Sequence, residues 1–163
     1  LLGMRPDDER IPDSFEIARK MGLSYSFGIA NLTSAHPNSV VLEVKGKSGR
    51  TLEVQACSLG GGRIMINRLD GLDVNCSCEI PTLIVHNLDQ PGHVAEVTSM
   101  LAHKSVNIAN MSLYRDKRGG SAVMVVEMDQ PLPKESLEWL EHLEGIVKVT
   151  YINVTEGEED DVL

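Results

Sequence analysis

The order of apolar patterns in the second half of the sequence most constrains how this chain can fold. Short runs rich in Val and Ile, typical of strands, alternate with longer segments whose apolar residues recur every three or four positions, as on a helix. Strands are expected at 82–87, 107–115, 121–128 and 146–154, and helices at 92–104 and within 131–145. This strand–helix–strand–strand–helix–strand order predicts a ferredoxin-like α+β unit, with both helices on one face of an antiparallel sheet.

The first half is expected to be mostly antiparallel sheet with one helix, incomplete at its N-terminus. The pattern predicts a helix at 13–20, a half-buried strand at 23–29, and hairpins that pair 39–44 with 51–58 and 63–69 with 72–78. Glycine and charged residues separate the paired strands. We expect residues 1–79 to form this α/β domain, residues 80–155 the second domain, and residues 156–163 a disordered acidic tail.

Composition excludes several classes of function. The net charge of −9 argues against nucleic acid as a partner, and the apolar runs are too short for a membrane helix. No signal peptide is recognisable. The chain starts at Leu1, so we treat it as a fragment.

Three cysteines, Cys57, Cys76 and Cys78, indicate reduced thiols and a cytoplasmic protein. Cys76 and Cys78 form a C-x-C pair without a second pair. Structural zinc sites and iron–sulfur clusters use four ligands, so we expect packed thiols and no metal.

The corner between the strand at 82–87 and the following helix can hold an anion. A helix N-terminus presents unpaired backbone N–H groups and a partial positive charge, and Gly92 allows close approach. The alternative is a simple turn, in which Asp89 caps the helix. The side chain of His93 is expected to pack on the surface and to face solvent.

The segment "DQPGHVAEVTSMLAHKSVNIANM", residues 89–111, resembles the ACT domain, an amino-acid-binding regulatory module. The resemblance implies a ligand held between the corner of one copy and the sheet edge of a second, so it also implies a homodimer. The implied effector contacts are Asn87, Asp89, Gly92 and Asn107, with L-serine as the ligand. An ionised Asp89 only accepts hydrogen bonds, so it suits the ammonium of serine but not its carboxylate.

The first half narrows the family. "PDDERIPDSFEIARKMG", "AHPNSVVLEV" and "SLGGGRIMINRLDG" resemble the allosteric-substrate-binding domain of iron–sulfur L-serine dehydratases, whose beta chain joins it to an ACT domain. The resemblance implies conversion of L-serine to pyruvate and ammonia, with a 4Fe-4S cluster on a partner alpha chain. It implies no catalytic residue and no metal site in this chain, which alone would be inactive.

Three further residues, His36, Asn38 and Arg63, are candidates for contact with an anion or a subunit. Gly60, Gly61 and Gly62 before Arg63 match neither a dinucleotide fingerprint nor a P-loop and are expected to form a bulge or a close backbone approach. Two other functions remain open: the regulatory tail of a D-3-phosphoglycerate dehydrogenase, and a stand-alone amino-acid-binding ACT protein.

Overall fold

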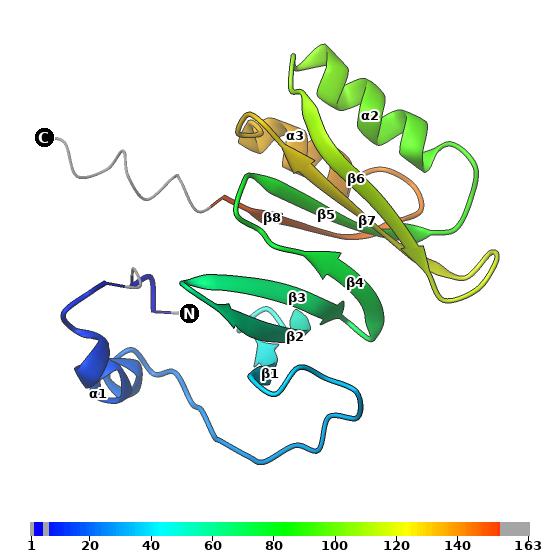
Figure 1. Ribbon diagram of the computed structural model, residues 1–163. Helices are drawn as coiled ribbons and strands as arrows, with labels where there is room; N and C mark the ends of the chain where they lie inside the picture. Colours follow the sequence, from blue (N-terminus) through cyan, green and yellow to red (C-terminus); the bar gives the residue numbers. More distant parts are fainter. Residues whose placement is uncertain (1, 5–6, 154–163) are drawn as a thin grey trace, which may run out of the picture. The chain divides into compact units, whose positions relative to one another are not determined.

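The computed structural model describes residues 2–4 and 7–153, and its internal contacts divide the chain into Leu1–Thr33 and Ser34–Leu163 (Figure 1). The first unit contains a 3-10 turn, η1 (Ile11–Asp13), and one helix, α1 (Ser14–Lys20), close to the predicted bounds. None of the described helices is long and apolar enough to cross a membrane. The predictions for residues 154–163 lie outside the described residues.

The strand predicted at 23–29 is wrong. This segment has no regular structure, and the side chains of Phe27 and Ile29 are exposed. A strand requires a neighbour to satisfy its backbone hydrogen bonds, and no described strand pairs with this segment. Its aromatic residues cluster locally instead, since the ring centroids of Tyr25 and Phe27 lie 5.3 Å and 5.7 Å from that of Phe15.

The second unit begins with a four-stranded antiparallel sheet in the order β1-β2-β3-β4, which we call the N-terminal sheet. Its strands are β1 (Ser39–Lys45), β2 (Thr51–Gly60), β3 (Arg63–Leu69) and β4 (Leu72–Cys76). The pairing confirms both predicted hairpins. In the turn between β2 and β3, Gly60, Gly61 and Gly62 all have positive φ, and the register shifts there, as a bulge requires. A Cβ on any of them would have no neighbour within 4 Å, so the run serves the turn and not a close approach.

The second sheet, here the C-terminal sheet, has the order β6-β7-β5-β8 and confirms the ferredoxin-like α+β prediction. Its elements are β5 (Thr82–Leu88), α2 (His93–His103), β6 (Ile108–Arg115), β7 (Ser121–Met128), α3 (Lys134–Glu141) and β8 (Ile146–Ile152). Both helices lie on one face of the sheet (Figure 1).

Both faces of the C-terminal sheet are covered. Leu83 and Val85 lie in the core that includes α2 and α3, whereas Ile84 lies in a second core shared with the N-terminal sheet. The three side chains are at most 1% exposed, and burial of each contributes about 1.5–3 kcal/mol. Strand β5 is therefore apolar at successive positions, as expected when both faces of a sheet are buried.

The second core joins the two sheets. It contains Ile66, Leu69, Val74 and Cys76 from the N-terminal sheet and Val123 and Val125 from β7. The face of the C-terminal sheet opposite its helices is thus occupied within the same chain, and β6 and β8 form the edges of this sheet.

Candidate functional site

The corner between β5 and α2 has an uncapped helix N-terminus. Gly92 is the N-cap residue, with a φ of 110°, and no side chain of the described residues makes a capping hydrogen bond there. Asp89 therefore does not cap the helix, contrary to the alternative interpretation. The first N–H groups of α2 have no acceptor within the helix and carry its partial positive charge, so the corner retains the features that attract an anion.

Asn87 adds a buried acceptor to this corner. Its side chain amide Nδ2 donates a 2.7 Å hydrogen bond to the carbonyl of Leu88, which fixes the orientation of the amide. The residue is 6% exposed, and its Oδ1 has no hydrogen-bond partner among the described residues. A buried acceptor without a partner costs about 1–3 kcal/mol, so a ligand N–H or O–H at this position would be stabilising.

Asp89 is anchored to the turn between β6 and β7. Its Oδ2 accepts hydrogen bonds from the backbone N–H of Gly119 at 2.9 Å and from the guanidinium of Arg115 at 3.1 Å. The Gly119 N–H, with Arg115, holds the pKa of Asp89 below its ordinary value. Sequence reasoning missed Arg115, which places a positive charge beside Asp89 and so weakens its repulsion of a carboxylate.

His93 is buried, so the prediction that it faces solvent is wrong. Its exposure is 7%, because the loop after α3 closes over it: a Cβ on Gly145 would lie 2.5 Å from Nε2 of the ring. The carbonyl of Gly145 also accepts a hydrogen bond from the N–H of Leu88 at 2.9 Å. Gly145 therefore joins the end of β5 to the start of α2.

Asn107 lies away from the other predicted effector contacts of the same chain. Asn87 pairs with Ala122 of β7, whereas Ile108, next to Asn107, pairs with Met128. Six residues along a strand span about 20 Å, so one chain does not bring Asn87 and Asn107 together. The Nδ2 of Asn107 donates to Asp129 at 2.6 Å.

His36, Asn38 and Arg63 are brought to the same end of the N-terminal sheet. The carbonyl of Asn38 accepts a hydrogen bond from the N–H of Ser58, and Ser58 pairs with Ile64, next to Arg63. All three predicted residues are exposed. Nδ1 of His36 accepts a 3.2 Å hydrogen bond from the N–H of Asn38, which orders the loop before β1.

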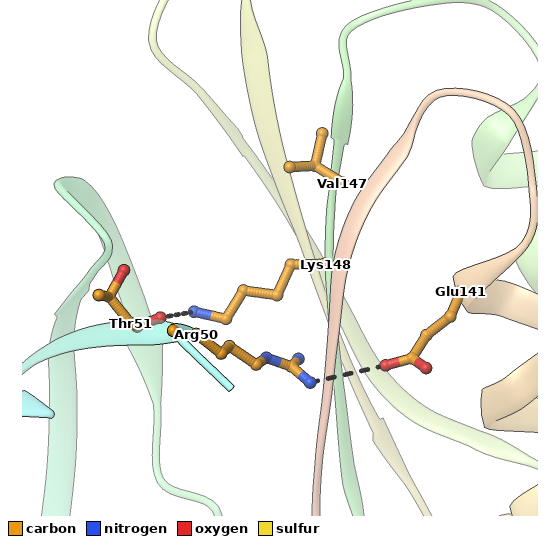
Figure 2. Close-up of a pocket in the computed structure, with 6 residues that line it drawn as sticks. Arg50, Thr51, Glu141, Val147 and Lys148 are labelled. Atoms are coloured by element: carbon orange, nitrogen blue, oxygen red, sulfur yellow. Dashed lines mark hydrogen bonds and ion pairs between the residues drawn. The ribbon is translucent and has the colours of Figure 1, made fainter. Parts of the chain in front are cut away.

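An open pocket of about 530 Å³ lies where the β1–β2 hairpin meets β8 and α3 (Figure 2). Arg50, Lys148 and Glu141 contribute the charges of its lining. The guanidinium of Arg50 lies 3.7 Å from the carboxylate of Glu141 and donates to the carbonyl of Val149. These contacts join the β1–β2 hairpin to α3 and β8, so Arg50 and Glu141 are paired within the same chain.

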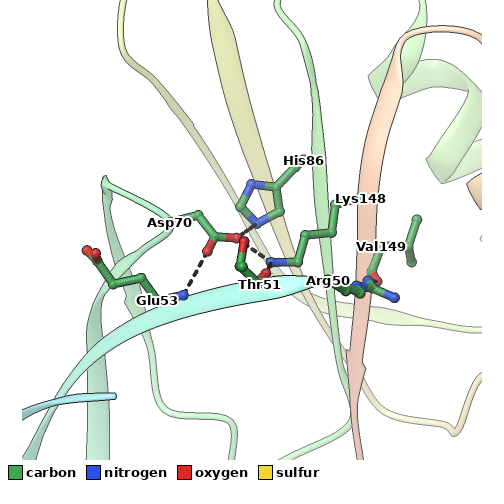
Figure 3. Close-up of polar contacts among 7 residues, drawn as sticks. All are labelled: Arg50, Thr51, Glu53, Asp70, His86, Lys148 and Val149. Atoms are coloured by element: carbon green, nitrogen blue, oxygen red, sulfur yellow. Dashed lines mark hydrogen bonds and ion pairs between the residues drawn. The ribbon is translucent and has the colours of Figure 1, made fainter. Parts of the chain in front are cut away.

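A polar cluster beside this pocket joins the two sheets (Figure 3). Asp70 accepts hydrogen bonds from Lys148 and from the backbone N–H of Glu53, and Nε2 of His86 lies 3.6 Å from its carboxylate. Burial is the largest single influence on the pKa of Asp70 and would raise it, but the hydrogen bonds from Lys148 and from the Glu53 N–H, with the charge of Lys148, together outweigh burial and the pKa is lowered. Burial lowers the pKa of His86.

Sequence reasoning did not find this cluster. The sequence feature that could have indicated the cluster is a polar residue, His86 or Lys148, inside an otherwise apolar strand. That signal becomes interpretable only when the covering sheet is known, because the N-terminal sheet supplies Asp70.

Comparison with known proteins identifies the family to which this chain belongs. The chain is 33% identical over 152 residues to a probable L-serine dehydratase, beta chain, of Bacillus subtilis, covering 93% of this chain and 69% of the relative. It is 31% identical over 155 residues to the L-serine dehydratase, beta chain, of Peptoniphilus asaccharolyticus, covering 94% and 70%. The chain belongs to the L-serine dehydratase beta-chain family.

The ACT domain model matches residues 81–144, from just before β5 into the loop after α3, as the resemblance predicted. A D-3-phosphoglycerate dehydrogenase of Methanocaldococcus jannaschii is 31% identical over 90 residues, 55% of this chain but 17% of the relative. The beta-chain family is therefore favoured over the dehydrogenase alternative.

The residues of this family member do not fit a four-iron cluster. Such a cluster takes four thiolates, and the sequence contains three cysteines. Cys57 lies in β2, whereas Cys76 is the last residue of β4 and contacts Cys78, which follows the strand. Within residues 2–4 and 7–153, no three His, Cys, Asp or Glu side chains converge as metal ligands.

Proposed function

We propose that the chain is the regulatory and assembly part of an L-serine dehydratase that converts L-serine to pyruvate and ammonia. A partner alpha chain carries the 4Fe-4S cluster and the lyase chemistry, and this chain alone is inactive. Residues 1–79 form the domain that contacts the alpha chain, and residues 80–155 form the ACT domain. Membership of the beta-chain family, with a match along 93% of the chain, supports this assignment.

The ACT corner is the proposed L-serine site, and the unpartnered Oδ1 of Asn87 is the observation that carries this proposal. The serine carboxylate would accept from the uncapped N–H groups at Gly92, where the helix partial charge is positive. The ammonium or hydroxyl of serine would donate to Oδ1 of Asn87 and to Asp89. Because the Arg115 ion pair neutralises much of the charge of Asp89, the corner accommodates a zwitterion.

The site requires two copies of the chain. If the edge strands β6 of two copies pair antiparallel along their full length, Ile108 of one copy lies opposite Arg115 of the other. Arg115 pairs with Ala122, which in turn pairs with Asn87. Asn107 of one copy would thus lie level with the corner of the second copy, which one chain alone does not achieve.

The end of the N-terminal sheet that carries His36, Asn38 and Arg63 is the proposed contact with the alpha chain. These residues are exposed and lie at one end of the sheet, with β2 between Asn38 and Arg63, and Arg63 forms no ion pair with a described residue, so its charge is available to a partner. An acidic or carboxylate group on the alpha chain would match them.

Two measurements test these proposals. Pyruvate formation from L-serine is expected when this chain and the cluster-bearing alpha chain are combined, and none is expected from this chain alone. Isothermal calorimetry with millimolar L-serine should give binding heat for the wild-type chain and none for Asn107→Ala. The absence of heat from the wild-type chain would show that the corner is a structural turn that does not bind L-serine. It would not affect the proposed role of the chain as a subunit.

A further inference from the structure

The linker between the two sheets holds two cysteine sulfurs in contact. Cys76 is the last residue of β4 and Cys78 follows two residues later, and their sulfur atoms are 3.0 Å apart. Side chains two apart on a regular strand are separated by about 6.5 Å. Here the strand has ended, and Cys78 has a φ of 55°. Few residues other than glycine adopt that conformation, so the backbone is shaped to bring the sulfurs together.

The surroundings make the two thiols unequal. Both residues are buried, with exposures of 2% for Cys76 and 6% for Cys78. The contact with Cys78 lowers the pKa of Cys76 against the opposing effect of burial, whereas the contact with Cys76, together with burial, raises the pKa of Cys78. One sulfur is therefore the better nucleophile, and a second thiol lies beside it.

We propose that Cys76 and Cys78 are a reversible redox pair that a peroxide oxidises to a disulfide within the linker. The Cys76 thiolate attacks one peroxide oxygen, the O–O bond breaks, and the departing hydroxide takes a proton to become water. The sulfur of Cys78 then displaces the hydroxyl of the resulting sulfenic acid, which leaves as a second water with the thiol proton. Two thiols lose two electrons, and the peroxide gains them.

The fold accommodates this change with little movement. A disulfide bond is about 2.05 Å long, so the sulfurs need to approach by about 1 Å from their present 3.0 Å separation. The ring would close between β4, whose Cys76 pairs with Ile66, and β5, which starts at Thr82. Oxidation would therefore act on the connection between the N-terminal and C-terminal sheets. A metal is a poorer match, because no third ligand converges on the pair among the described residues.

The test uses the full chain in its native assembly, reduced and then treated with hydrogen peroxide near neutral pH. Samples taken over time are unfolded in an alkylating reagent and weighed by mass spectrometry. Cys76 and Cys78 are expected to lose their thiols together, at least about tenfold faster than Cys57, because the nucleophilic thiolate governs oxidation. After alkylation the product should carry one alkyl group and the reduced chain three, and dithiothreitol added before alkylation should restore all three thiols.

Two serine variants serve as controls. Cys78→Ser removes the resolving thiol, so Cys76 should stop at a sulfenic acid that dimedone traps. Cys57→Ser, which leaves the pair intact, should oxidise as wild type does. The proposal is overturned if wild type keeps all three thiols, or if a disulfide forms only after unfolding. It is also overturned if Cys57 reacts as fast as the pair.

Discussion

Replacement of Gly145 by alanine tests how the ACT corner is held. Gly145 has a φ of +81°, and an added Cβ would lie 2.5 Å from Nε2 and 2.6 Å from Cε1 of His93. The left-handed backbone costs alanine about 1–2 kcal/mol, and displacement of a buried ring adds about 1–3 kcal/mol. We therefore expect Gly145→Ala to lower the free energy of unfolding by about 2–5 kcal/mol in urea denaturation followed by circular dichroism.

Gly71→Ala is the matched control. Gly71 has nearly the same φ, +83°, but a Cβ there would have no neighbour within 4 Å, so only the backbone cost of about 1–2 kcal/mol is expected. In a His93→Ala background, Gly145→Ala should cost no more than Gly71→Ala, because the ring is gone. If Gly145→Ala and Gly71→Ala lower the free energy of unfolding equally with His93 present, the close contact between Gly145 and His93 does not hold the corner.

The polar cluster gives two further predictions. Because burial lowers the pKa of His86, the unfolded chain takes up a proton below about pH 6.5 that the folded chain does not. The free energy of unfolding should therefore be highest above that pH and should fall as the pH drops toward the pKa of His86 in the folded chain. His86→Gln should make this fall less steep. Equal slopes of unfolding free energy against pH for wild type and His86→Gln between pH 5 and 8 would contradict this. Lys148→Met leaves Asp70 with its backbone donor and the mostly neutral His86, so it should lower the free energy of unfolding by about 2 kcal/mol, below the 3–5 kcal/mol of a fully buried pair. A change under about 0.5 kcal/mol in urea denaturation would show that the pair contributes nothing measurable.

The C-terminal sheet was predictable because its pattern is local. Each strand and helix between Thr82 and Ile152 has its own apolar period, and glycine or proline follows β5, β6, β7 and α3 within a few residues. The segment at 23–29 has the same alternating pattern but forms no strand, since periodicity identifies a face and not a partner. Strand formation depends on a neighbour that the pattern does not specify.

The candidate site was predictable in part. The uncapped corner at Gly92 follows from the order of strand, glycine and helix. The burial of His93 did not follow, because it depends on Gly145, which is more than fifty residues away in the sequence. The contacts of Asp89 with Arg115 and Gly119 likewise come from a distant hairpin turn.

The cluster of Asp70, His86 and Lys148 was likewise not predictable, because it joins residues from the two halves of the sequence. Composition indicated two halves but gave no reason for them to share a face. The second core and this cluster show that the halves in residues 34–153 are joined by both apolar and charged contacts.

A complementation experiment tests the two-copy serine site most directly. Asn87→Ala and Asn107→Ala chains carrying different affinity tags are combined, and the mixed dimers are isolated. Each variant alone should show no L-serine heat in calorimetry, because every site lacks one of the two asparagines. The mixed dimer has one site with both residues intact, so binding of one L-serine per dimer should return with wild-type affinity. Mixed dimers that stay silent while wild type binds would contradict a site shared between two copies.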